Sequence, residues 1–299
     1  MKTHRSEKDG QPVDECKDIG LIGVGLLGSA LAERLLKAGF IVQGFDTDGE
    51  QLQALAASGG HAAPDAAAVA RTCRRILLSL PHSGIVRSVV EELGEDLRAG
   101  ALIIDTTTGA PDETVALARQ LAERGIGYID ATVGGSSVQA RDGHALMMVG
   151  GAPEHLEDAR DILDTISSNI VLTGGSGSGA RMKLVFNLVL GLNRAVLAEG
   201  LAFAQASGLD PRASLEVLRG GVAASAVMDF KGEKMLTRDF RPQARLAQHL
   251  KDVDLILQTA QSSGTELPLS TLHRTLLSKL ADQGYGDEDN SAIIRAYDA

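Results

Sequence analysis

The chain has 299 residues, of which 44% are hydrophobic, 23% are charged and 3% are aromatic, and its formal net charge is -10. This length is enough for two domains, whereas the acidic balance argues against binding nucleic acid, which needs a clustered basic surface. Two cysteines, Cys16 and Cys73, cannot form a disulfide framework, and no Cys/His spacing suggests zinc, so we expect a reducing, cytoplasmic location and no metal site.

The first 18 residues are polar and lack the apolar centre of a signal peptide. They also contain Asp and Glu, which argues against an organelle transit peptide. We therefore expect residues 1–18 to be a disordered leader, with the fold starting near Ile19. No window approaches 18 consecutive apolar residues, so we expect neither a membrane span nor a membrane partner.

From Ile19 to about Leu172, short aliphatic runs alternate with helical patterns such as Leu27–Ala38 and Pro111–Arg124. The predicted strands are Ile19–Val24, Ile41–Asp46, Arg75–Leu80, Leu102–Asp105, Gly127–Asp130, Ala145–Val149 and Asn169–Leu172. Alternation of this kind predicts parallel strands joined by crossover helices, that is, a doubly wound, mostly parallel α/β sheet of the Rossmann type. The last two strands could extend that sheet.

A glycine-rich turn follows the first predicted strand and precedes the first helix. It reads G-x-G-x-x-G, formed by Gly23, Val24, Gly25, Leu26, Leu27 and Gly28. In a dinucleotide-binding loop the first glycine permits the tight turn, the second lets the backbone approach a pyrophosphate, and the third allows close helix–strand packing. A purely structural turn is the alternative, but the strand–helix context favours a site with the phosphates at the helix N-terminus.

The second predicted strand ends at Asp46. An acid at this position accepts hydrogen bonds from the adenosine ribose hydroxyls. It would also repel the extra phosphate of NADP, as would Asp48, and no arginine follows directly to offset them. A solvated turn aspartate is the alternative. We predict that the cofactor is NAD and that NADP is disfavoured.

The pattern of the sequence changes at the glycine- and serine-rich segment Thr173–Gly179, which reads TGGSGSG. After it, apolar residues recur at helical spacing almost to the end of the chain. Residues 180–206 could form one long helix that is apolar on most faces, which indicates burial between protein layers. We therefore predict a Rossmann domain over residues 19–178 and an all-α domain for substrate binding and oligomerisation over residues 179–299.

Together with the glycine fingerprint, several segments in a fixed order resemble the β-hydroxyacid dehydrogenases, which include 3-hydroxyisobutyrate dehydrogenase and tartronate semialdehyde reductase. These segments are Leu80-Pro81, Asp105–Pro111 (DTTTGAP), Asp130–Ser136 (DATVGGS), Gly179–Asn187 (GARMKLVFN) and Lys251-Asp252. The resemblance covers about residues 19–285. It implies an enzyme that transfers a hydride between NAD and a small hydroxyacid or semialdehyde.

The resemblance also implies roles for individual residues. Lys183 matches the catalytic lysine of the family, and Asn187 matches an asparagine that helps to hold the substrate. The cofactor is expected to contact Leu80-Pro81, Thr108 near the nicotinamide, and Lys251, which reaches back from the helical domain. The loop Asp130–Ser136 matches the segment that cradles the substrate carboxylate.

Three departures from the family pattern lie in this loop and one on the long helix. Thr132, Gly134 and Ser136 stand where the family usually has proline, serine and glycine, and Phe186 replaces a residue that is often polar. The serine hydroxyl expected at Gly134 is therefore missing, and Ser136 or Ser137 could supply it. Such changes put the family's usual substrate in doubt, though not the reaction type.

The residues themselves support this chemistry. A lysine at its reference pKa of about 10.4 is a poor base, but burial near other positive charge, such as Lys251, would lower the pKa of Lys183. The i, i+4 spacing puts Asn187 on the same helix face. Gly134, Gly135, Ser136 and Ser137 could form a nest of backbone N–H groups that binds an anion. The structural alternatives are a surface lysine, an asparagine that bonds within the core, and an ordinary turn.

Rival functions are an imine reductase-like enzyme, against which Lys183 counts, 6-phosphogluconate dehydrogenase, whose helical domain is considerably larger, and a catalytically silent NAD-binding module. The expected partners are a small carboxylate substrate and further copies of the chain. A homodimer or homotetramer is expected because the long helix is apolar on more faces than one small domain can cover, and the resemblance implies the same.

Overall fold

The computed structural model describes residues 17–298, so the predicted leader lies outside the described residues except for its last two positions. Eight strands form one sheet in the order β3-β2-β1-β4-β5-β6-β7-β8. The strands are β1 (Asp18–Ile22), β2 (Ile41–Phe45), β3 (His61–Ala62), β4 (Arg75–Leu78), β5 (Leu102–Asp105), β6 (Gly127–Gly134), β7 (Leu146–Gly151) and β8 (Asn169–Gly174). Neighbouring strands are parallel except β6 and β7. The predicted fold class is therefore confirmed, and the last two strands do extend the sheet.

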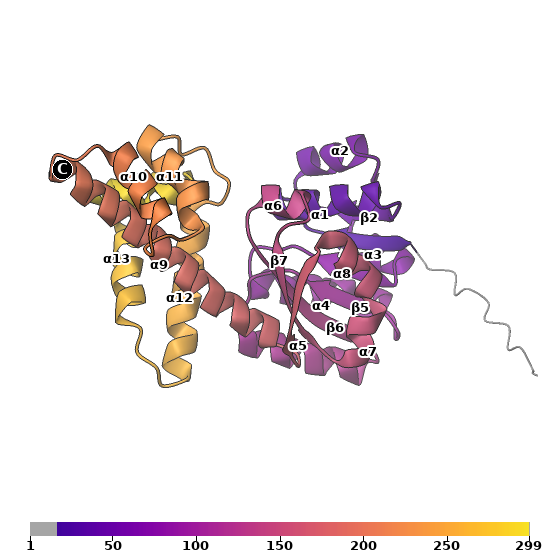
Figure 1. Cartoon of the computed structure of the whole chain (residues 1–299). Helices are drawn as coiled ribbons and strands as arrows, with labels where there is room; N and C mark the ends of the chain where they lie inside the picture. The colour runs from indigo at the N-terminus through magenta and orange to yellow at the C-terminus, as the bar shows by residue number, and fades with distance from the viewer. Residues whose placement is uncertain (1–16, 299) are drawn as a thin grey trace, which may run out of the picture.

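Helices cover both faces of the sheet, and a group of helices follows it (Figure 1). They are α1 (Leu26–Lys37), α2 (Gly49–Ala57), α3 (Ala66–Thr72), α4 (Ser83–Leu93), α5 (Pro111–Glu123), α6 (Ser137–Arg141), α7 (Pro153–Asp158), α8 (Arg160–Ile166), α9 (Ser178–Ala206), α10 (Pro211–Gly220), α11 (Val227–Thr237), α12 (Leu246–Ser262) and α13 (Pro268–Asp282), with the 3-10 turns η1 (Gly94–Asp96), η2 (Tyr285–Asp287) and η3 (Asn290–Tyr297).

Each layer of the molecule has its own apolar core. One core joins the sheet to α1 and α8 through residues such as Leu31 and Ile162, and a second joins the opposite face to α3, α4 and α5 through residues such as Val90 and Leu121. A third core, which includes Leu201 and Leu277, joins the C-terminal helices. Burial of such side chains is the main favourable term in folding.

The structure differs from the sequence-based prediction at several strand ends and by one additional strand, and three of these differences have a clear physical reason. Strand β6 continues to Gly134 because its second half pairs with the antiparallel strand β7, with Gly134 opposite Leu146. Strand β4 ends at Leu78 because the chain then turns, and the backbone N–H of Leu80 donates to Thr107 Oγ1 at 3.1 Å. The two-residue strand β3 was not predicted, since so short a segment shows no periodicity.

Helix α9 begins beside the sheet and continues into the group of C-terminal helices (Figure 1). Its beginning is fixed on β6, because the Asp130 carboxylate accepts hydrogen bonds from the backbone N–H groups of Gly177 and Ala180 at 2.7 and 2.8 Å. A Cβ on Gly179 would lie 2.6 Å from the carbonyl oxygen of Met148. The glycine-rich entry thus lets the helix approach the sheet closely, which places its first turns at the end of β6.

The length and composition of α9 also match those of a membrane-spanning helix, with a mean hydropathy of 1.4 over 18 residues. We expected from the absence of 18 consecutive apolar residues that no segment spans a membrane, and this match of length and composition alone does not contradict that expectation. The helix carries the buried polar side chains Lys183, Asn187 and Arg194 and packs on β6, β7 and α12. We interpret it as a core helix.

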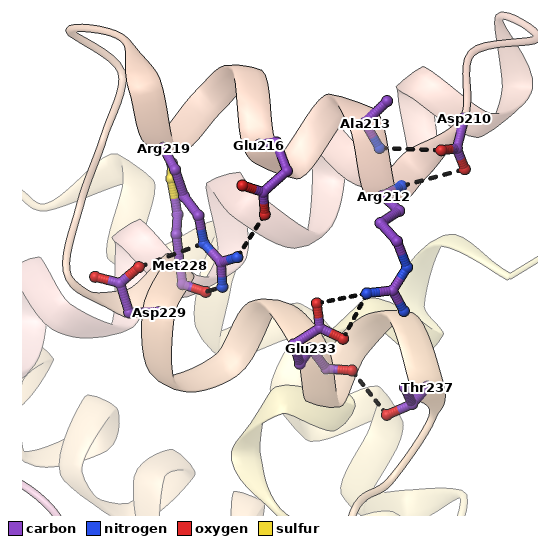
Figure 2. A network of polar contacts seen from close by, with 9 residues as sticks. All are labelled: Asp210, Arg212, Ala213, Glu216, Arg219, Met228, Asp229, Glu233 and Thr237. Carbon is purple, nitrogen blue, oxygen red and sulfur yellow. Dashed lines mark hydrogen bonds and ion pairs between the residues drawn. The ribbon is translucent and has the colours of Figure 1, made fainter.

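Helices α10 and α11 are held together by exposed polar contacts (Figure 2). Asp210 caps α10 by accepting from the N–H of Ala213 at 3.1 Å, and Arg212 pairs with Glu233 of α11 at 2.8 Å. Arg219 donates to the carbonyl oxygen of Met228 at 2.9 Å. Exposed ion pairs stabilise by only about 0 to 1 kcal/mol each, so we interpret this network as fixing the orientation of the two helices.

Candidate active site

The glycine fingerprint has the geometry that a bound dinucleotide requires. Gly23 has φ +93° and a Cβ there would lie 2.3 Å from the carbonyl oxygen of Ser79, so only glycine fits the turn. A Cβ on Gly28 would lie 2.0 Å from the carbonyl oxygen of Gly23, so α1 packs directly against the turn. A Cβ on Gly25 would meet nothing within 4 Å. Gly25 thus borders open space at the N-terminus of α1, where a pyrophosphate can approach the backbone.

Asp46 lies beside this loop. Its carboxylate accepts hydrogen bonds from the backbone N–H groups of Val24, at 2.6 Å, and of Asp48, at 2.9 Å. These two bonds hold the carboxylate at the end of β2, one strand away from the glycine turn. A carboxylate in this place can accept hydrogen bonds from ribose hydroxyls.

Lys251 of α12 brings together three segments that the sequence had assigned to the cofactor. Its Nζ donates to the carbonyl oxygens of Pro81 and Thr108, each at 3.1 Å. Thr108 and Lys251 also line a pocket of about 350 Å³ together with residues of α4 and α12. A side chain of the C-terminal helices therefore reaches the ends of β4 and β5, and it places a positive charge there.

Lys183 is buried at the carboxyl end of β6. Its Nζ donates to the carbonyl oxygen of Val133 at 2.6 Å. Burial lowers the pKa of Lys183 to about 8; the charge of Asp252 opposes this shift, and the charge of Lys251 adds to it. A lysine with this pKa can both accept and donate a proton near neutral pH.

Asn187 follows Lys183 by one helical turn and is also buried. Its Nδ2 donates to Asp252 Oδ2 at 2.9 Å, and the other oxygen of Asp252 lies 2.9 Å from Lys251 Nζ. Asp252 therefore links Asn187 on α9 to Lys251 on α12. The motif Lys251-Asp252 in the sequence gave Asp252 no role. Its contacts with Asn187 and Lys251 explain why an acid follows the lysine.

Some polar groups of the loop after β6 form hydrogen bonds within the protein. Ser136 caps α6: its Oγ accepts from the N–H of Gln139 at 3.3 Å, while Gln139 Oε1 accepts from the N–H of Ser136 at 2.9 Å. The Ser136 N–H therefore does not point into a nest for an anion as the sequence suggested. Gly135, which is exposed at φ +142°, and Ser137 stand beside it.

A buried basic cluster lies behind this site on the same face of α9, and sequence reasoning missed it. The rings of His249 and His273 lie 5.2 Å apart, centroid to centroid. A Cβ on Gly191 would lie 2.4 Å from His249 Nε2, so the glycine admits the ring. The pKa of His249 lies well below its usual value. Burial is the largest cause, and the charges of Arg194, His273 and Lys183 add to it. The spacing Lys183, Gly191, Arg194 on one helix face was the available signal.

Among the described residues, no group of three or more His, Cys, Asp or Glu side chains is arranged to hold a metal ion. The candidate site is built instead from backbone groups of the glycine loop and from lysine and amide side chains. Such an arrangement can bind an anionic dinucleotide at one end and a small carboxylate at the other, with a proton donor between them.

Two family models match consecutive parts of the chain. Residues 18–175 match the NAD binding domain of 6-phosphogluconate dehydrogenase. Residues 177–297 match the NAD-binding domain of NADP-dependent 3-hydroxyisobutyrate dehydrogenase. Together the two models cover nearly all of the described residues.

Known proteins resemble the chain over its length. The 2-(hydroxymethyl)glutarate dehydrogenase of Eubacterium barkeri is 33% identical over 284 residues, which are 94% of each chain. The 2-hydroxy-3-oxopropionate reductase of Escherichia coli is 32% identical and is aligned over 93% of this chain and 96% of its own. The crystal structure of 3-hydroxyisobutyrate dehydrogenase from Salmonella typhimurium, 24% identical, superposes with a TM-score of 0.86 over 93% of this chain and 99% of its own, which shows a shared fold.

Proposed function

The chain belongs to the β-hydroxyacid dehydrogenase family, NAD(P)-dependent enzymes that act on small hydroxyacids, as its motifs predicted, and we propose that it interconverts a small 3-hydroxyacid and its semialdehyde or keto form with NAD. The observation that carries this proposal is the buried Lys183, with a pKa of about 8, beside the loop that follows β6.

Each residue of the site has a part in the proposed reaction. A nicotinamide held by the fingerprint loop would supply the hydride acceptor or donor. During oxidation Lys183 takes the proton from the hydroxyl oxygen of the substrate as the hydride leaves the carbon that carries this hydroxyl. During reduction protonated Lys183 returns the proton to the developing alkoxide oxygen. Asn187 orients the substrate from the same helix face, and its own amide is fixed by Asp252. We assign binding of the substrate carboxylate to Gly134, Gly135 and Ser136 or Ser137, with Ser136 contributing through its hydroxyl because its N–H donates to Gln139.

The choice between NAD and NADP is also part of the proposal. The family includes NADP-dependent members, but Asp46 stands where a ribose 2′-phosphate would have to be accommodated, and its oxygens are held in place by Val24 and Asp48. We infer that NAD is preferred. The cofactor contacts would come from the fingerprint loop, Asp46, Leu80-Pro81, Thr108 and Lys251.

A screen of cofactor reduction across small 3-hydroxyacids, with NADH oxidation by the matching semialdehydes, tests the proposed reaction. We expect turnover with at least one member and a kcat/KM at least tenfold higher with NAD than with NADP, which is about 1.4 kcal/mol of transition-state preference. Tight NAD binding without turnover of any hydroxyacid or semialdehyde would contradict the proposal. Turnover of cyclic imines instead would support an imine reductase.

Self-association is proposed from a stripe of exposed apolar side chains on α9. Their exposed fractions range from 40% to 73%, and their spacing puts them on one side of the helix: Met182, Val185, Val189, Val196 and Phe203. Exposed apolar patches on a surface helix tend to mark interfaces, and twofold symmetric dimers are the commonest solution. We therefore propose a homodimer or homotetramer. A cytoplasmic location, and the absence of nucleic-acid and membrane partners, stay predictions from composition.

Light scattering at micromolar concentration tests this assembly. We expect a mass of two or four times 31.3 kDa, and a lower mass for the double variant Val189→Asp/Val196→Asp, whose charges would have to be buried at the interface. A wild-type mass near that of one chain would contradict the proposal.

A further inference from the structure

The ring of Phe186 occupies the space beside Gly134. A Cβ built on Gly134 would lie 3.1 Å from Phe186 Cζ, 3.2 Å from Cε1 and 3.2 Å from Met148 Cε. These distances are shorter than ordinary contacts between carbon atoms, so a side chain at position 134 would force the ring or the methionine to move. Gly134 is buried and has an ordinary backbone conformation. Its glycine is therefore explained by the ring and not by the turn.

The same ring lies beside the proton donor. Lys183 Nζ is 5.3 Å from the centroid of the Phe186 ring and donates to the carbonyl oxygen of Val133, the residue before Gly134. Phe186 is only partly buried, whereas Lys183 and Asn187 on either side of it in the sequence are buried. Part of the ring is thus accessible, while the ring as a whole lies beside the amine of Lys183.

A ring in this place makes one wall of the site apolar. A hydroxyl or charged group pressed against it would lose its water without gaining a partner, which is unfavourable. A methyl or methylene group placed there would instead be favoured by about fourfold in binding for each buried carbon. The departures from the family pattern at positions 134 and 186 therefore belong together, because the glycine leaves the space that the phenylalanine ring fills.

We infer that Phe186, seated over Gly134, is a specificity-determining residue that selects small hydroxyacids with an alkyl substituent next to the reacting carbon over those with a hydroxyl there. This inference rests on the proposed function and names its substrate class. Phe186 contributes no proton and no charge. Its role is to contact the substituent of the substrate while Lys183 and Asn187 hold the reacting end.

Three acids that share one carbon frame test the inference: 3-hydroxypropionate, 3-hydroxy-2-methylpropionate and glycerate, which carry hydrogen, methyl and hydroxyl at carbon 2. We expect wild-type kcat/KM to be at least about tenfold higher for the methyl than for the hydroxyl compound, the size expected for a polar group that loses its partner. Phe186→Ser should reduce this ratio about tenfold, and Phe186→Leu should largely keep it.

The contact between the two residues gives a second readout. Gly134→Ser alone should lower kcat/KM for all three acids, because the ring must move, whereas in the Phe186→Ser background the same change should cost less. A double-mutant cycle measures this coupling. Matched controls are Phe230→Ser on α11, where the ring is 52% exposed, and Gly200→Ser on α9, where a Cβ meets nothing within 4 Å; both should leave the ratio unchanged.

The outcomes separate this inference from the proposed function. Turnover with an unchanged methyl-to-hydroxyl ratio in Phe186→Ser, a wild-type preference for glycerate, or additive effects of the two substitutions would overturn the inference alone. Failure of the wild-type enzyme to turn over any 3-hydroxyacid would overturn both. A reduced ratio in Phe186→Ser, together with coupling to Gly134, would support the inference.

Discussion

The glycine-rich loops after β1 and β6 differ in what fills the space beside their glycines. At Gly25 in the first loop a Cβ would meet nothing within 4 Å, whereas at Gly134, the last residue of β6 before the second loop, it would meet the ring of Phe186 at 3.1 Å. The first loop leaves room for a ligand, and the second leaves room for the protein's own side chain. A glycine after a strand therefore indicates close approach, but only the structure says of what.

The two loops also differ in the chemistry that they offer. The first presents backbone N–H groups at the start of α1, which suit a phosphate and cannot change charge. The second has Lys183 hydrogen-bonded to it through Val133, and burial lowers the pKa of that lysine to about 8. In our account the first loop binds the cofactor, whereas the second lies beside Lys183 of α9, which transfers the proton.

Lys183→Ala gives the largest expected effect, because it removes the proton donor that α9 places beside the second loop and leaves the first loop unchanged. The kcat should fall by about 10² or more, the usual range for loss of a general acid–base group, while NAD affinity measured by calorimetry stays nearly unchanged. Lys279→Ala, which removes an exposed lysine of α13, is the control and should keep full activity. Retained turnover in Lys183→Ala would show that the two loops do not divide the work in this way.

Ser136→Ala and Ser137→Ala examine how the second loop holds a carboxylate. If either hydroxyl bonds the substrate, its loss should lower kcat/KM by roughly 10- to 150-fold without weakening NAD binding. Ser136→Ala should also cost about 1 kcal/mol in the free energy of unfolding, since Ser136 caps α6, whereas Ser137→Ala should not. Full activity of both variants would mean that the carboxylate is held elsewhere, with Lys251 the next candidate.

Asp46→Ala examines the first loop in the same manner. Removing the carboxylate should erode a preference for NAD over NADP of about tenfold or more, because the repulsion of the 2′-phosphate is lost. The measurement is kcat/KM with each cofactor and one substrate. Asp282→Ala, at the end of α13, is a control of equal charge change. A wild-type enzyme that uses NADP as well as NAD would refute the inference that NAD is the preferred cofactor.

Alanine in place of each loop glycine should give the smallest effects and the sharpest contrast. Gly134→Ala should destabilise the fold by about 1 kcal/mol, since the ring has to shift in a packed site. Gly25→Ala should leave the free energy of unfolding nearly unchanged and weaken NAD binding instead. Denaturant unfolding and NAD titration of both variants provide the comparison; the same pattern for both glycines would remove the distinction between the loops.

The sequence was sufficient for the parts of the molecule that follow local rules. The strand before Gly23, the turn at Gly23–Gly28 and the helix from Ser178 follow from periodicity and from glycine chemistry, so they could be predicted closely. The contact between Asn187 and Asp252 joins residues 65 positions apart, and the contact of Phe186 with Gly134 likewise joins α9 to β6. Such pairings depend on how helices pack on the sheet and on one another, which no local pattern encodes.

The pH dependence of the reaction in both directions tests most directly the claim that Lys183 transfers the proton. Oxidation needs neutral Lys183, so kcat/KM for the hydroxyacid should rise with pH and level off above about 8, whereas kcat/KM for reduction, which needs the protonated form, should fall above about 8. The residual activity of Lys183→Ala should lack both transitions. Transitions that persist in Lys183→Ala, or a wild-type midpoint near the ordinary lysine value of 10.5, would contradict the account.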